Sequence, residues 1–168
     1  MRVAGVVIAI AMALALQTAL ARLLVGGTVA LDLVLVVVVY VALTNGPVTG
    51  ICAGSLAGLI QDALSSGVIG IGGLAKSLVG FVTGAIGQQF IVTAALPRFV
   101  MFLAATVAHA AVFMGLYVLL ELRSFPSPWT AIVSQALGNA VVGVTAFTII
   151  ESLPGIAERR RLSRRTRH

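Results

Sequence analysis

Charged residues are scarce in this 168-residue chain, at 10% of the sequence, whereas hydrophobic residues make up 60%. The mean hydropathy is +1.12. A soluble domain of ordinary composition carries about 25% charged residues, which cover its surface. The shortage of charge therefore excludes an ordinary soluble enzyme domain. It predicts a polytopic membrane protein whose function lies within the bilayer or depends on partners.

Residues that commonly carry chemistry are also few. Cys52 is the single cysteine, so an intrachain disulfide is excluded, and its apolar surroundings make it a small hydrophobic residue first. His109 has no second histidine or thiol at metal-ligand spacing. The sequence holds neither a nucleophile–base set nor a phosphate-binding loop. We expect no catalytic residue, no metal and no cofactor.

Apolar segments follow one another at membrane-spanning length, and turn signals separate them. A spanning helix needs ~20 apolar residues, so the chain has room for about six. The second segment is rich in valine and resembles a strand, but an isolated strand in lipid leaves its backbone unpaired. We therefore expect a short helix there, which is either tilted little or partly buried by its neighbours. The predicted fold is an all-α helix bundle over residues 1–156, with helices at about 3–24, 29–43, 48–64, 71–93, 99–120 and 130–153.

Arginines are distributed unequally between the two faces of a six-span arrangement. Arg2, Arg98 and the six arginines of the basic tail at 157–168 fall on one face. Arg22 and Arg123 fall on the other, with Lys76 as a further candidate for that face. Cytoplasmic loops and tails collect such residues, so both termini are expected in the cytoplasm. A five-span arrangement would place Arg2 opposite the tail.

Each end of the chain also has a second interpretation. The tail is suited to anionic lipid headgroups as well as to fixing topology, and its lack of interleaved aromatic residues argues against nucleic acid. At the other end, Arg2 and the Ala19-Leu20-Ala21 motif resemble a signal peptide. The apolar run between them is long enough to span, which argues against cleavage.

Glycines recur every fourth residue in the third and fourth segments. On a helix this spacing places them on one face, where the missing side chains let two backbones approach closely. The two segments are joined by a short loop, so we expect them to pack as an antiparallel pair. The candidate packing residues are Gly46, Gly50, Gly54, Gly58, Gly80 and Gly84.

Three charged residues inside the predicted bundle are candidates for an ion pair or a partner contact. Asp62 ends the third segment and Lys76 begins the fourth, so we expect them to pair near the outer face. That pair could fix the hairpin, could bind or transport a ligand, or could be replaced by snorkelling to water. Asp32 is expected either to cap the second helix or to contact a partner or Arg22. The amides of Gln135 and Asn139 predict hydrogen bonds between helices.

The middle of the chain resembles a known family. The run Leu31-Asp32-Leu33 to Leu43 is followed by Gly46-Pro47, by the spaced glycines ending in Gly58-Leu59-Ile60-Gln61-Asp62, and by Gly67, Gly70, Leu74, Lys76 and Gly80. This order resembles the signature of MreD, the rod shape-determining membrane proteins of bacteria. Many members have Pro-Asp where this chain has Leu31-Asp32, and the basic tail carries no motif of the family.

The resemblance implies a non-enzymatic scaffold of the cell-elongation machinery in the bacterial inner membrane. MreD-like proteins associate with MreC, a bitopic protein with a periplasmic domain. Through MreC they connect to MreB filaments and to the glycosyltransferase and transpeptidase that build peptidoglycan. The resemblance also implies a fold similar to the substrate-binding subunits of energy-coupling-factor transporters. A vitamin-type transporter subunit is therefore the alternative function, and a pore-forming protein is a third.

Overall fold

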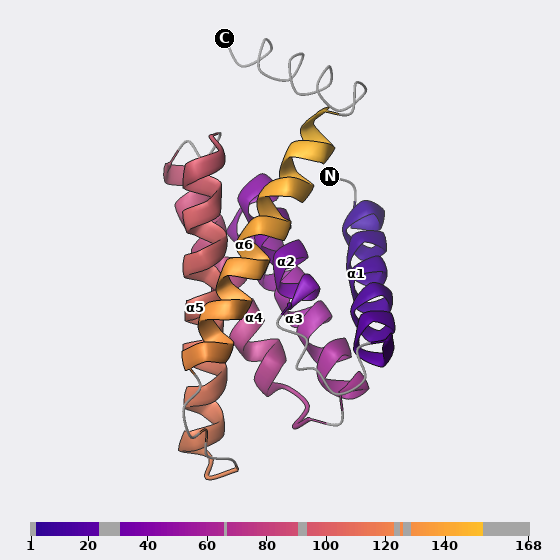
Figure 1. The fold of residues 1–168 in the computed structure, drawn as a ribbon, viewed down its shortest axis with the longest axis vertical. Coiled ribbons are helices and arrows are strands. Elements are labelled where there is room, and N and C mark those ends of the chain that lie inside the picture. Colours follow the sequence, from indigo (N-terminus) through magenta and orange to yellow (C-terminus); the bar gives the residue numbers. More distant parts are fainter. Residues whose placement is uncertain are drawn as a thin grey trace.

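A computed structural model describes residues 3–23, 31–65, 67–90, 94–122, 125 and 129–152, without the side chains of residues 21–23. Six α-helices account for nearly all of these residues (Figure 1). They are α1 (Val3–Leu23), α2 (Leu33–Asn45), α3 (Pro47–Leu64), α4 (Ile71–Gln89), α5 (Ala95–Leu119) and α6 (Trp129–Ser152). The predicted all-α class is confirmed.

The helices differ in how well each could span a bilayer alone. Helices α1, α5 and α6 contain segments long and apolar enough to cross a membrane. Helix α2 is apolar but has 13 residues, about two thirds of the usual spanning length. Helices α3 and α4 have 18 and 19 residues but are rich in glycine. This is a multi-pass membrane protein with three helices of ordinary spanning character among the described residues.

The fifth helix begins earlier than expected. Sequence reasoning placed Pro97 and Arg98 before it, but α5 starts at Ala95 and includes both. Proline is tolerated in the first turn of a helix, because the backbone N–H groups there have no partner within the helix.

The valine-rich segment forms the centre of the bundle. Helix α2 contacts each of the other five helices, and Val34, Val38 and Val41 are fully buried. A helix that is apolar on all sides is stable where neighbours surround it. Its short length and strand-like composition are therefore compatible with a helix in this central position.

A one-residue turn connects α2 to α3. Gly46 adopts a φ of +93°, which favours glycine, and its N–H donates to the carbonyl of Ala42 at 2.8 Å. Pro47 follows as the first residue of α3, where its fixed φ suits the start of a helix. The turn makes α2 and α3 adjacent.

Helices α3 and α4 form the most extensive helix pair in the structure. A methyl group built on Gly50 would collide with the backbone carbonyl of Gly80, and one on Gly54 with the carbonyl of Lys76. A methyl on Gly58 would meet the backbone of Gly72 and Gly73, and one on Gly84 the backbone of Pro47. The backbones are thus in contact along the whole pair, as small residues permit.

The bundle can be described as a central trio with helices on two sides (Figure 1). The central trio is α2, α3 and α4. Helix α1 lies on one side of it, and α5 and α6 form a hairpin on the other. We call the end that carries Val3 and the α2–α3 turn the near end, uppermost in Figure 1, and the opposite end the far end.

The backbone contact between α3 and α4 leads to a stability prediction. Gly54→Leu and Gly58→Leu should each lower the free energy of unfolding, since overpacking costs ~1–3 kcal/mol. The control is Val82→Leu, at an exposed position of α4. Thermal unfolding in detergent measures the effect. Equal stability of all three variants would show that the glycine face is not a packing surface.

Candidate functional site

The start of α2 is buried in the bundle, and its own N-cap residue and two other helices supply its hydrogen-bond partners. Asp32 caps it, because its Oδ1 accepts from the N–H of Leu35 at 2.9 Å. Gln17 of α1 accepts from the N–H of Val34 at 3.3 Å. The side-chain oxygen of Asn139 in α6 accepts from the N–H of Asp32 at 2.9 Å. These acceptors satisfy N–H groups that a helix start otherwise leaves unpaired.

Lys76 forms a buried ion pair at this helix start. Its Nζ lies 2.9 Å from Oδ2 of Asp32, and both residues are less than 5% exposed. The Nζ also lies 3.1 Å from Nε2 of His109 on α5. A paired lysine ammonium carries donors only, so Nε2 accepts and the proton of the neutral imidazole is on Nδ1. We call Asp32, Lys76 and His109 the buried triad.

The triad corrects the ion pair expected from the sequence. Lys76 pairs with Asp32, and the carboxylate of Asp62 instead caps α4. Oδ2 of Asp62 accepts from the N–H groups of Gly70, Gly72 and Gly73 at 2.9, 3.0 and 3.2 Å. The N-terminal end of a helix attracts a carboxylate in this way. Asp62 thus closes the α3–α4 hairpin through backbone groups.

Asn139 extends the network into the α5–α6 hairpin. Its Nδ2 donates to Oγ1 of Thr106 at 3.2 Å, and that hydroxyl donates to the carbonyl of Phe102 at 2.8 Å. Asn139 is fully buried, and Gln135 is partly buried. The expected hydrogen bonding between helices is therefore seen for Asn139, which links α2 and α5 through α6.

A second ion pair lies at the near end. Arg98 of α5 donates to both carboxylate oxygens of Glu151 in α6, at 2.8 and 2.9 Å, in a bidentate arrangement. Its guanidinium carbon also lies 4.2 Å from the ring centroid of Phe147. Sequence reasoning used Arg98 as a topology marker and missed Glu151. The usable signal was one acid near the end of α6 and one arginine near the start of α5.

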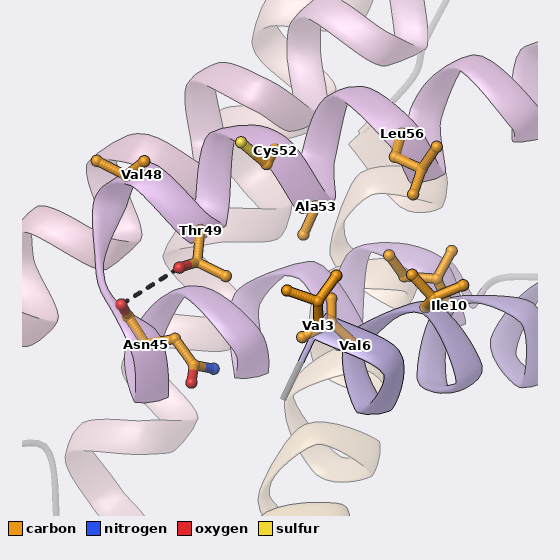
Figure 2. A pocket seen from close by; sticks show the side chains of 10 residues that line it. Val3, Val6, Ile10, Asn45, Val48, Thr49, Cys52, Ala53 and Leu56 are labelled. Carbon is orange, nitrogen blue, oxygen red and sulfur yellow. Dashed lines mark hydrogen bonds between the residues drawn. The ribbon is translucent and has the colours of Figure 1, made fainter. Parts of the chain in front are cut away.

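An apolar groove lies between α1 and α3 (Figure 2). It has a volume of about 290 Å³. Val3, Val6 and Ile10 face Ala53 and Leu56 across it. Cys52 lies on its edge and is exposed. The described residues include no group of three or more histidine, cysteine, aspartate or glutamate side chains that could hold a metal ion.

Comparison with known proteins identifies the family. The family model described as rod shape-determining protein MreD matches residues 2–152. The chain belongs to the MreD family. MreD is a family of shape-determining membrane proteins and not of enzymes. Because the match covers residues 2–152, the resemblance seen in the middle of the chain is confirmed over almost its whole length. No curated protein and no solved structure matches the chain. The expected likeness of this MreD protein to transporter subunits stays a prediction.

The triad makes an energetic prediction for this MreD protein. Lys76→Met removes the ammonium, and Asp32→Asn removes the charge while keeping a cap acceptor. Each should destabilise strongly, because an unpaired buried charge costs ~3–5 kcal/mol. The double variant should lose clearly less than the sum of the two. Free energies of unfolding in mild detergent measure this coupling.

The matched control is a second double-mutant cycle, in which Asp62 takes the place of Asp32. Asp62→Asn combined with Lys76→Met should give additive losses, since Asp62 bonds to backbone N–H groups. Additivity in the Asp32 cycle, with coupling in the Asp62 cycle, would restore the pair expected from the sequence.

Proposed function

We propose that this MreD protein is a scaffold subunit of the bacterial rod complex that binds the transmembrane helix of an MreC-like bitopic protein. The family match over residues 2–152 is the observation that carries the proposal. Through this partner the subunit acts on MreB filaments and on the glycosyltransferase and transpeptidase of lateral wall synthesis. Its role is to hold the partner in place and not to move a solute.

The distribution of polar groups supports a scaffold. Asp32, Lys76, His109 and Asn139 are turned into the bundle and bonded to one another. Large apolar residues such as Met12, Leu56 and Val141 are exposed instead. In lipid, helices associate through close van der Waals packing and a few hydrogen bonds. A surface of this kind suits an apolar helix better than a polar ligand.

The orientation in the membrane is part of the same proposal. The near end, with Arg98 and the end of α6, faces the cytoplasm, so that both termini and the basic tail at 157–168 lie there beside anionic lipid headgroups. Arg2, Arg123 and the tail lie outside the described residues, as does the side chain of Arg22. The positions of these arginines in the sequence support this orientation.

Coexpression with an MreC-like protein tests the binding. A stoichiometric complex that survives detergent is expected, whereas a control bitopic protein with an unrelated transmembrane helix should not copurify. In a rod-shaped source organism, depletion of the subunit should convert rods to spheres. Loss of the complex together with tight binding of a vitamin-sized ligand would favour the transporter-subunit alternative.

Reporter fusions test the orientation. A fusion at Met1 and one at His168 should both report the cytoplasm, and one in the loop around Phe125 should report the opposite side. A periplasmic signal from either terminus would contradict the six-span arrangement.

A further inference from the structure

The α5–α6 hairpin is a unit separate from the central trio. Within it, Arg98 pairs with Glu151, and Phe102 packs where Gly143 has no side chain. The contacts inside the trio and inside the hairpin are each more extensive than those of any helix pair between the two units. Among the described residues, α1 and α3 do not contribute to the contact with the hairpin.

At the near end, aromatic packing and the chain itself hold the two units together. The ring of Tyr40 in α2 lies 4.6 Å, centroid to centroid, from that of Phe147 in α6. The chain also passes from α4 to α5 at this end. At the far end the chain connects α3 to α4 and α5 to α6, so no covalent link there joins the trio to the hairpin.

In the far half, three polar contacts join the two units among the residues that the structure describes. Lys76 donates to His109 at 3.1 Å, and the N–H of Asp32 donates to Asn139 at 2.9 Å. The N–H of Val68 donates to the hydroxyl of Tyr117 at 3.3 Å. An apolar groove of about 210 Å³ lies along the seam between α4 and α5, from the level of the Lys76–His109 contact toward the near end. Side-chain packing therefore does not close this part of the seam.

Separation in the far half would leave the buried ion pair intact. Asp32 and Lys76 both belong to the trio, and their ion pair does not involve the hairpin. Asn139 keeps its bond to Thr106 within the hairpin. Apolar side chains exchange protein for lipid with little penalty, because lipid tails are equally apolar. The separation therefore breaks three hydrogen bonds and isolates no ion.

We propose that the α5–α6 hairpin pivots about its near end and that these three contacts form a latch that holds its far half closed. His109 has the contacts expected of a latch residue, because only one of its two ring nitrogens is bonded. Its Nε2 contacts Lys76, and its Nδ1 is buried without a hydrogen-bond partner among the described residues. The inference concerns the motion of this chain alone and does not depend on the proposed partner.

Distance measurements between spin labels in lipid nanodiscs test the latch. In a Cys52→Ser background, one label pair replaces Leu74 and Val118 across the far half. A second pair replaces Val48 and Val100 near the pivot. All four positions are exposed. Tyr117→Phe removes one hydroxyl oxygen, and Asn139→Leu removes the acceptor for Asp32. The matched control is Thr145→Val, whose hydroxyl bonds to carbonyls of its own helix.

Each latch variant should enlarge a longer-distance population of the far pair about threefold to tenfold, as expected for one hydrogen bond in lipid. The near pair and the Thr145→Val control should be unchanged. The latch is wrong if the far pair keeps one unaltered distribution in both latch variants. It is also wrong if the near pair lengthens equally or if the control behaves like the latch variants.

Discussion

A buried ammonium must have an anion beside it, and the placement of Lys76 makes this requirement central to the bundle. Removing a charge from water costs several kcal/mol even after relaxation, and good geometry with a counter-ion is needed to offset this. Asp32 provides the counter-ion at 2.9 Å. Because Asp32 also caps α2, the same contact fixes where the central helix begins.

This position of Asp32 explains the other polar contacts. A helix that begins inside a bundle brings unpaired N–H groups into surroundings without water, and each must find an acceptor. Gln17 and Asn139 supply two of them from α1 and α6. Asp62 performs the same task for α4. The polar residues of this chain thus satisfy the ends of two helices in addition to balancing charge.

The sequence predicted some of this arrangement well. Six helices and the close approach of α3 to α4 follow from apolar length and from the spacing of Gly50, Gly54 and Gly58, which are local patterns. The cap that Asp32 forms on α2 was also one of the roles expected for it from the sequence. The partner of Lys76 was predicted wrongly. Asp62 is nearer to Lys76 in sequence than Asp32 is, and the short loop between α3 and α4 suggested that Asp62 and Lys76 would meet. Thr106 and Glu151 were missed, because contacts between distant helices depend on how the helices rotate about their axes.

Solid-state NMR in lipid tests the central claim most directly. Lys76 is the single lysine of the chain, and Asp32 and Asp62 are its two aspartates. Lysine labelled with ¹⁵N at Nζ and aspartate labelled with ¹³C at the carboxyl carbon therefore report one distance in an Asp62→Asn variant. We predict strong dipolar dephasing between Lys76 and Asp32, as the 2.9 Å contact requires. The absence of dephasing in that variant, with strong dephasing in an Asp32→Asn variant, would contradict the account.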